Sequence, residues 1–275
     1  MLSDRNSLEQ VSLKIKKGKI TLIAGPSGSG KTTLLRHLKK ELLPKGKRSG
    51  KVLYDGQEIE QLKDLQSVKE VGYLFQNPSA QMVMDTVWHE IAFGLENLRM
   101  PYEQMKRTVA EIVNYFDLQK IYHEDTDKLS GGQKQLVNLA AVMAMHPKVL
   151  ILDEPTSYLD VKYKLELLSI LERMARQKKI TVIMSLHEID LAQKISDKII
   201  CVKGETISHY GSPEKVFTEE IIRELYGINN GYFDPLFGSI ELPAPEGEPE
   251  VFVISSGGTG IPVYRRLQKE HIPFA

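Results

Sequence analysis

The sequence has almost no cysteine, no net charge and no long apolar run. Its single cysteine, Cys201, excludes an internal disulfide, and the apolar run 199–202 around it predicts a buried thiol in a reducing compartment. No stretch approaches the ~20 apolar residues that cross a bilayer, and the first ten residues lack the apolar core of a secretory signal. Any work at a membrane is therefore expected to take place from its surface.

Neither sign of charge is in excess, because 36 basic residues balance 36 acidic ones over 275 residues. A global basic field that would hold nucleic acid is therefore excluded, although a local patch could still do so. Hydrophobic residues make up 41% and charged residues 26%, which is typical of soluble globular proteins and not of disordered or disulfide-rich ones. We expect no nucleic-acid partner.

The spacing of apolar residues predicts an α/β fold with a mostly parallel sheet. Predicted strands alternate with helical patterns over much of the chain, as in doubly wound proteins. The strands are expected at 11–15 and 20–24 as a hairpin, at 50–59 as a pair turning at Asp55-Gly56, and at 149–152, 180–185 and 199–202. Helices are expected at about 131–145 and 161–177, and from Glu188 onward.

The domain organisation follows from changes in these patterns. Residues 1–228 are expected to form the main domain, with an antiparallel β subdomain and a helical insertion at about 77–145. Prolines and acids in 229–250 are typical of an extended linker. Within residues 251–275 the pattern predicts a strand at 251–254 and a helix at 262–269, and one strand and one helix cannot bury their own apolar faces. This tail either packs on the main domain or begins a domain that is cut short, for which a regulatory role is one option.

A glycine-rich segment, GPSGSGKT at 25–32, joins a predicted strand to a predicted helix and matches the phosphate loop G-x-x-x-x-G-K-[ST]. Its backbone N–H groups and the helix dipole bind phosphate, the lysine reaches the β and γ phosphates, and the threonine hydroxyl is a ligand for Mg²⁺. A flexible turn is the alternative. The residues expected to contact nucleotide are Gly25, Pro26, Ser27, Gly28, Ser29, Gly30, Lys31, Thr32 and Thr33.

Two carboxylates, Asp153 and Glu154, end the apolar strand 149–152. Strand periodicity predicts that their side chains point to opposite faces, so that one can hold Mg²⁺ while the other polarises a water. We assign Asp153 to the metal and Glu154 to the general base. A solvated acidic turn is the alternative.

A third motif, LSGGQ at 129–133, combines Ser130 with Gln133 in a capping-box spacing. A helix is therefore expected to begin here, and Gly131 and Gly132 leave its positive end open to an anion. By itself the pattern also fits an ordinary helix start.

Taken in order, these motifs resemble the ATPase domain of ABC transporters over about residues 8–225. The resemblance adds Gln76 in Phe75-Gln76-Asn77, Asp160 in SYLD and His187. The block 75–98 is most similar to the ATPases of energy-coupling-factor importers. The resemblance implies a P-loop NTPase that binds ATP and Mg²⁺ and hydrolyses ATP to ADP and phosphate.

The same resemblance implies a head-to-tail dimer with a second copy or a paralogue. Ser130, Gly131, Gly132 and Gln133 would then contact the nucleotide of the other subunit, and Asp160 would connect the two sites. Gln76 would be a ligand of Mg²⁺ that also senses the attacking water, and His187 would bind the γ-phosphate. An exposed strand-end amide, a loop acid and an ordinary surface histidine are the alternatives for Gln76, Asp160 and His187.

Transmembrane transporter subunits are the implied partners, with the chain peripheral on the cytoplasmic face of the cell membrane. A groove in the helical insertion would receive a helix from them, and we expect Trp88 or Met84 to line it. The rival class is a soluble ABC-type ATPase acting on nucleic acid or ribosomes. The block from Gln76 to Ser130 is too short for the long coiled-coil insertion of that class.

Two further patterns bear on the site. Ser185 and Glu188 have the spacing of a capping box, which would place His187 beside a helix start. Members of the resembled family stack an aromatic residue on adenine, yet no aromatic residue precedes Tyr54 here. Arg5 could stack on the base instead, or the amino-terminal strand is missing from this chain.

Overall fold

The computed structural model describes residues 8–234, 238–243, 245–256 and 258–274. These residues fall into two compact units, which divide between Val216 and Phe217. Each unit is described by itself. Within the described residues, no helix is both long and apolar enough to span a bilayer.

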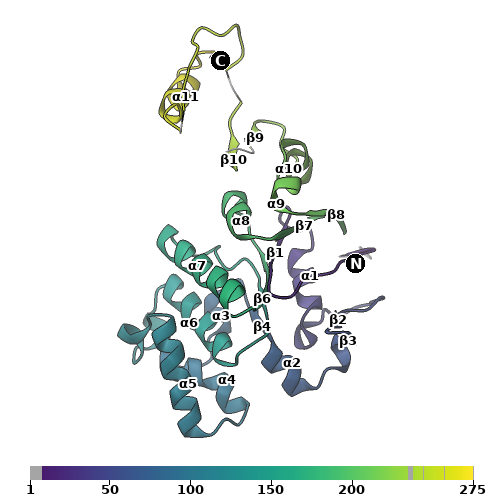
Figure 1. Ribbon diagram of the computed structural model, residues 1–275, viewed down its shortest axis with the longest axis vertical. Coiled ribbons are helices and arrows are strands. Elements are labelled where there is room, and N and C mark those ends of the chain that lie inside the picture. The colour runs from purple at the N-terminus through teal and green to yellow at the C-terminus, as the bar shows by residue number, and fades with distance from the viewer. Residues whose placement is uncertain (1–7, 235–237, 244, 257, 275) are drawn as a thin grey trace, which may run out of the picture. The chain divides into compact units, whose positions relative to one another are not determined.

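A six-stranded sheet forms the centre of the first unit (Figure 1). Its order is β4 (Val71–Leu74), β5 (Val149–Leu152), β6 (Thr181–Ser185), β1 (Ile20–Ala24), β7 (Lys198–Lys203) and β8 (Thr206–Gly211). The strands from β4 to β7 pair in parallel and β8 pairs antiparallel with β7, so the predicted mostly parallel α/β sheet is confirmed. Cys201 lies fully buried in β7, as expected.

Helices cover the sheet and supply its core. Helix α1 (Lys31–His37) packs Leu34 and Leu35 against the face that carries Ile23, Ile151 and Ile183. Helix α7 (Val161–Gln177) lies on the other side of the sheet in Figure 1. The remaining helices of the first unit outside the insertion are α2 (Asp64–Glu70), α8 (Ile189–Ile195) and α9 (Pro213–Val216), with 3₁₀ turns at Lys40–Leu42 and Ile59–Gln61.

The helical insertion is present where the sequence predicts it. It consists of α3 (Pro78–Gln81), α4 (Val87–Asn97), α5 (Tyr102–Tyr115) and α6 (Gly131–Ala144), with 3₁₀ turns at Gln119–Ile121 and Thr126–Lys128. The apolar stripe of α5 is buried, and α6 is buried along most of its length and contacts α3, α4 and α5. Helix α6 therefore runs from the LSGGQ motif through the middle of the insertion.

The predicted hairpin at 11–24 is wrong. Residues 11–15 form no strand, and β1 pairs in parallel with β6 on one side and β7 on the other. Leu13 and Ile15 still pack, partly buried, against the core. The alternating apolar pattern here therefore reflects packing and not strand pairing. The pair around Asp55-Gly56 does form, as the short strands β2 (Leu53–Tyr54) and β3 (Gln57–Glu58).

The second unit contains α10 (Glu219–Tyr226), β9 (Tyr232–Asp234), β10 (Ser239–Glu241) and α11 (Ile261–Lys269). Strands β9 and β10 form an antiparallel hairpin inside the segment 229–250 that we expected to be an extended linker. The expected strand 251–254 is reduced to one parallel bridge between Val251 and Phe274, whose ring stacks on Tyr264. The tail helix is found where the sequence predicts it.

Asp197 ties the start of β1 to α7, and its removal is expected to destabilise the first unit. Its carboxylate accepts hydrogen bonds from the Ile20 N–H (2.9 Å), from Arg176 Nη1 (2.8 and 2.9 Å) and from Lys19 Nζ (3.2 Å). Burial alone would raise the pKa of Asp197, but these donors outweigh it and hold the pKa below its ordinary value. Asp197→Ala should lower the free energy of unfolding by ~1–3 kcal/mol at neutral pH, because a buried backbone donor loses its acceptor.

The sign of the pH dependence follows from the lowered pKa. The contribution of the Asp197 carboxylate to the free energy of unfolding is fully present above the unfolded-state pKa of about 3.9. It is lost as the pH falls through the lower folded-state pKa. Wild type and variant should therefore converge in acid. Urea unfolding followed by the fluorescence of Trp88, the chain's single tryptophan, measures this unit. Asp190→Ala, which removes a long 3.9 Å pair with Lys194, is the matched control and should change little.

Candidate active site

The loops after β1, β4, β5 and β6 meet at the carboxyl edge of the parallel sheet, where ligands bind in folds of this class. A cavity of about 690 Å³ opens there, a size typical of small-molecule sites. Its lining residues are Ser27, Gly28, Gly30, Lys31, Thr32, Thr33, Gln76, Glu154, His187, Gly204 and Glu205. The predicted phosphate loop, acidic pair, Gln76 and His187 are thus brought together.

The glycine loop has the backbone geometry that its sequence requires. Gly25 has φ 153°, and a Cβ there would lie 2.3 Å from the Val202 carbonyl oxygen, so the loop can pass this point only as glycine. Gly30 caps α1 with φ 97°. The Ser29 hydroxyl is buried without a hydrogen-bond partner in the described part of the chain. A cradle with an unsatisfied donor at the start of a helix fits a phosphate group.

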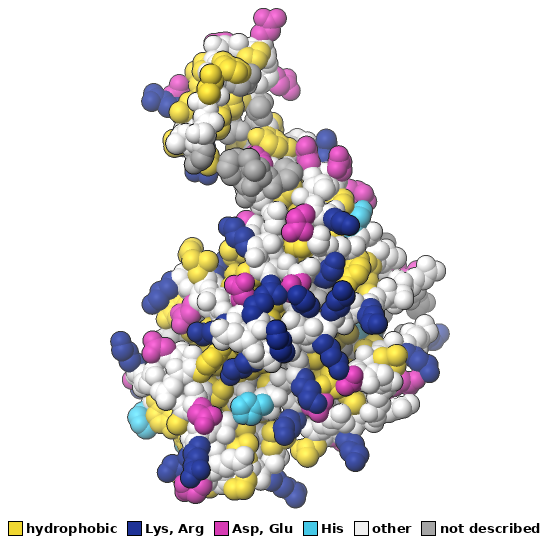
Figure 2. All heavy atoms as spheres, viewed as in Figure 1, with side chains coloured by type: hydrophobic (Ala, Val, Ile, Leu, Met, Phe, Trp, Pro, Cys, Tyr) yellow, Lys and Arg dark blue, Asp and Glu magenta, His cyan; other side chains and the backbone are white. Residues whose placement is uncertain are grey.

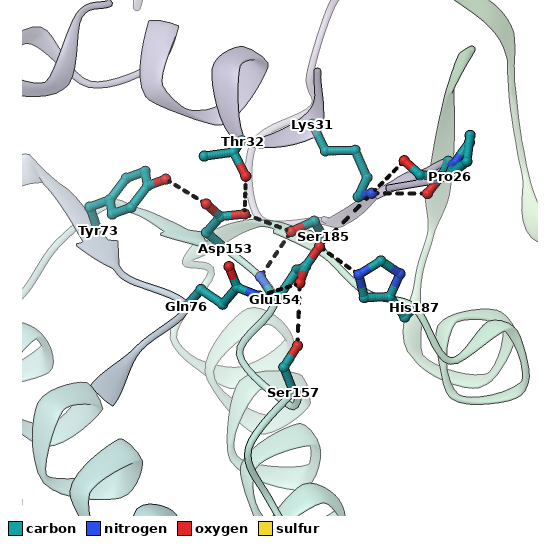
Figure 3. A network of polar contacts seen from close by, with 11 residues as sticks. Pro26, Lys31, Thr32, Tyr73, Gln76, Asp153, Glu154, Ser157, Ser185 and His187 are labelled. Atoms are coloured by element: carbon teal, nitrogen blue, oxygen red, sulfur yellow. Dashed lines mark hydrogen bonds and ion pairs between the residues drawn. The ribbon is translucent and has the colours of Figure 1, made fainter. Parts of the chain in front are cut away.

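Lys31 lies at the bottom of this loop, 4% exposed. Its ammonium donates to the carbonyl oxygens of Gly25 (2.9 Å) and Pro26 (3.0 Å) and lies 3.9 Å from Glu154 Oε1 (Figure 3). Burial lowers the pKa of Lys31, and the charges of Glu154 and Asp153 partly oppose this effect. The side chain is therefore a desolvated cation placed to meet phosphate oxygens.

Asp153 and Thr32 form a pair of hard oxygen donors. Asp153 Oδ1 accepts hydrogen bonds from Thr32 Oγ1 and Ser185 Oγ, both at 3.1 Å, and Oδ2 accepts one from Tyr73 (3.4 Å). Burial raises the pKa of Asp153, and the hydrogen bonds from Thr32 and Ser185 partly offset that rise. A hydroxyl beside a carboxylate is a donor set that Mg²⁺ prefers, so these residues fit the ion. Gln76, which we also predicted as a metal ligand, contacts Glu154 and not this pair.

Glu154 is the centre of the polar network in Figure 3. Its Oε2 accepts from Gln76 Nε2 at 2.7 Å and from Ser157 Oγ at 3.3 Å, and its Oε1 lies 2.6 Å from His187 Nε2. Its N–H donates to Ser185 Oγ at 2.8 Å. The carboxylate is therefore held by side chains from three different loops.

The expected reason for this placement of Glu154 is wrong. Strand β5 ends at Leu152, so strand periodicity does not extend to Glu154, which has φ 45°. This left-handed conformation is uncommon for a residue with a side chain and is concentrated at functional sites. The turn, and not the pleat of a strand, separates the directions of the two carboxylates.

The predicted capping box at Ser185 and Glu188 is also wrong. Helix α8 begins after Glu188, which makes no side-chain cap. Ser185 instead bonds the acidic pair, and Glu188 accepts from Thr156 (2.9 Å) and Lys164 (2.5 Å). His187 is nevertheless placed at the cavity, because it follows β6 at the same edge of the sheet.

The LSGGQ motif forms the predicted capping box but lies outside this cavity. Ser130 Oγ accepts from the Gln133 N–H at 3.3 Å, and Gln133 Oε1 accepts from the Ser130 N–H at 2.9 Å. Gly131 is exposed in the first turn of α6, while Gly132 is buried. Asp160 caps α7 through the Tyr163 N–H (3.0 Å) and does not line the cavity either.

Sequence reasoning missed several residues of the site. Tyr73, Ser157 and Ser185 hold the acidic pair, and Gly204 and Glu205 line the cavity. A serine ending a strand at the ligand edge is the one available signal, and it applies to Ser185. No phenylalanine, tyrosine or tryptophan is among the residues of the described chain that line the cavity, and Arg5 lies outside the described residues.

Comparison with known proteins distinguishes this site from those of other phosphate-loop proteins. The family model described as ABC transporter matches residues 8–157, more than half of the 275. The chain belongs to the ABC transporter family. Its central sheet, phosphate loop and LSGGQ helix are thus those of an ABC ATP-binding cassette, and the predicted P-loop NTPase fold is confirmed.

Curated relatives of this ABC chain are named as ATP-binding proteins. An ABC transporter ATP-binding protein of Bacillus cereus is 46% identical over 213 residues, which is 78% of this chain and 38% of that protein. This chain thus spans under two fifths of that relative's length. Energy-coupling factor transporter ATP-binding protein EcfA1 of Mycoplasmopsis synoviae is 38% identical over 229 residues, covering 82% of this chain and 84% of its own.

Solved structures share the cassette fold. The cbiO1 protein of Clostridium perfringens, described as part of the ABC transporter complex cbiONQ, aligns with a TM-score of 0.70 and 31% identity over 79% of this chain and 86% of its own. The ATP-binding cassette MJ0796, in a dimeric post-hydrolysis state bound to ADP and Pi, aligns with a TM-score of 0.68 and 25% identity over 78% and 94%.

Proposed function

We propose that this ABC chain binds and hydrolyses ATP as the nucleotide-binding subunit of a transporter. The observation that carries the proposal is the position of Glu154. Its carboxylate is bonded to Gln76 and His187 and lies 3.9 Å from Lys31, at the opening of a phosphate loop. A positioned base beside a phosphate cradle is what in-line attack of water on a γ-phosphate requires.

Each residue then has a role set by its contacts. The loop amides and Lys31 hold the phosphates, and Glu154 accepts the proton of the attacking water. Gln76 and His187 orient Glu154 and are within reach of the γ-phosphate region that the cavity offers. Thr32 and Asp153 would hold Mg²⁺, which supplies positive charge against the developing negative charge when bound.

The signature turn is proposed to act on the nucleotide of a second ATPase subunit. Ser130, Gly131, Gly132 and Gln133 lie outside the cavity of their own chain. Gly131 is exposed at the start of α6, whose positive helix end favours an anion. The dimeric, ADP- and Pi-bound relative supports such an assembly. Asp160, at the start of α7, is proposed to connect the two sites.

Transmembrane subunits and the direction of import complete the proposal. Support comes from the energy-coupling-factor relative and from cbiO1 within a transporter complex. We place the chain peripherally on the cytoplasmic face of the membrane. Trp88 and Met84, both half-buried in the insertion, remain proposed docking residues. The ring centroids of Trp88 and Tyr122 lie 5.7 Å apart, in an edge-to-face arrangement.

The rival function, action on nucleic acid or ribosomes, is not favoured by these relatives. Figure 2 shows both signs of charge on the visible face of the first unit, with lysine and arginine side chains frequent in its middle part. Salt-dependent binding of RNA or DNA by the purified chain would support the rival. Co-purification with proteins that span the membrane several times would support the transporter.

Lys31→Ala tests the nucleotide site directly. It should weaken ATP binding by at least tenfold, because a desolvated cation that contacts phosphate contributes roughly 1.5–3 kcal/mol. Binding of a fluorescent ATP analogue and release of phosphate measure the two activities. Lys51→Ala, which removes an exposed ammonium paired with Glu58 at 2.6 Å, is the control and should bind ATP normally. Equal binding by Lys31→Ala and wild type would contradict the proposed site.

A further inference from the structure

The loop that carries Gln76 is closed by amide side chains. Gln81, at the end of α3, accepts a hydrogen bond from the Phe75 N–H with Oε1 (2.9 Å) and donates to the Tyr73 carbonyl with Nε2 (3.3 Å). Asn77 Oδ1 accepts from the Ser79 N–H at 3.0 Å. These contacts bend the chain back on the end of β4, so Gln76 projects from a closed loop.

Helix α6 holds this loop from the other side. Asn138, fully buried in the middle of α6, donates from Nδ2 to the carbonyl oxygen of Pro78 at 2.8 Å. Lys134, one turn earlier, lies 3.5 Å from Ser79. Pro78 is two residues from Gln76, whose own amide reaches Glu154 at 2.7 Å. A short chain of contacts therefore runs from α6 through α3 to the base.

The other half of the Asn138 amide has no such partner. Its Oδ1 is buried without a hydrogen bond in the described part of the chain. A buried polar atom without a partner lowers stability, so packing alone does not account for an asparagine among the apolar residues of α6. What the residue provides is the donor to Pro78.

We propose that Asn138 is a positioning residue for Gln76, and that α6 thereby links the Ser130 turn to the base of its own chain. Asn138 lies eight residues after Ser130, about 12 Å along one rigid helix. If the nucleotide bound to a second subunit displaced the Ser130 turn, α6 would move Pro78 with it. The distance from Gln76 to Glu154 would then change. This inference rests on the proposed function.

A double-mutant cycle tests it with the full chain. Asn138→Ala should lower kcat for ATP hydrolysis by roughly tenfold or more, because small misplacement of catalytic groups has large effects on rate. The KM for ATP should change by less than about twofold, since the phosphate cradle is not touched. In a Gln76→Ala background, Asn138→Ala should cause no further loss, because its effect passes through Gln76.

Two more variants separate positioning from packing. Asn138→Leu fills the space without supplying a donor and should reproduce the fall in kcat, which keeps the test valid if Asn138→Ala does not fold. Ser67→Ala removes a buried hydroxyl that bonds Glu41. Neither residue lines the cavity, so this variant should leave kcat unchanged. If Asn138→Ala lowered kcat in the Gln76→Ala background by the same factor as in the wild type, the inference would be overturned. A wild-type kcat in Asn138→Leu would also overturn it. A wild-type chain without ATPase activity would instead contradict the proposed function.

Discussion

Glu154→Gln is expected to lower ATP hydrolysis by roughly 10²–10⁴-fold while leaving ATP binding intact. The amide keeps the shape of the carboxylate and can still meet Gln76 and Ser157, but it cannot take a proton from water. The phosphate loop, Lys31 and Thr32 are unchanged, so the nucleotide should still bind. Phosphate release and analogue binding on the same preparations measure the two effects.

Because product formation would open the assembly, the same variant should accumulate as a dimer with MgATP. Size-exclusion chromatography with light scattering would detect the doubling of mass. Glu172→Gln makes the same chemical change on an exposed position of α7 and should hydrolyse ATP and remain in its ordinary state. Hydrolysis by Glu154→Gln at the wild-type rate would remove Glu154 as the base, while a monomer that binds MgATP would contradict the assembly alone.

Most of this site could be predicted because its geometry follows from topology. Parallel strands end at one edge of a sheet, so motifs that follow strands 20–24, 149–152 and 180–185 must meet there. The glycine loop and the Ser130 cap are local patterns with few alternative structures, and both form as expected. The cavity that contains Lys31, Glu154 and His187 is the result.

What could not be predicted depends on contacts between distant parts of the chain. Ser185 meets Asp153 across 32 positions, and Asn138 meets Pro78 across 60, so no local periodicity indicates either contact. The left-handed turn at Glu154 breaks the strand period on which its direction was predicted. The alternating apolar residues at 11–15 pack partly buried against the core, but the predicted strand does not form, because strand pairing needs a partner that local sequence cannot supply.

Gly132→Ala is expected to destabilise the first unit and to prevent dimer formation with MgATP. A Cβ on Gly132 would lie 2.4 Å from both Cγ and Cδ2 of Tyr163, near the root of that side chain where a rotation gives little relief. Helix α6 and helix α7 would have to separate at this point. We expect a loss of ~1–3 kcal/mol in unfolding free energy, as for other overpacked contacts.

The neighbouring glycine provides a matched comparison of the opposite sign. A Cβ on Gly131 would be 3.4 Å from the Tyr158 carbonyl oxygen, an ordinary contact, and alanine is favoured over glycine in a helix by up to about 1 kcal/mol. Gly131→Ala should therefore leave stability equal or slightly raised in urea unfolding followed by Trp88. Equal stability of the two alanine variants would show that the Tyr163 contact does not constrain the turn.

The effect on assembly can be separated from the effect on folding. With Glu154→Gln as the background, Gly132→Ala should abolish the MgATP-dependent dimer even where the chain is folded, because the Ser130 end of α6 is displaced from α7. Adding Tyr163→Ala removes the ring that the new methyl group meets, so the pair should recover stability relative to the sum of the single changes. If the variant with Tyr163→Ala regains both stability and the dimer, Gly132 is required for the α6–α7 contact. If it regains stability alone, Gly132 is required for direct contact with the nucleotide of the other subunit.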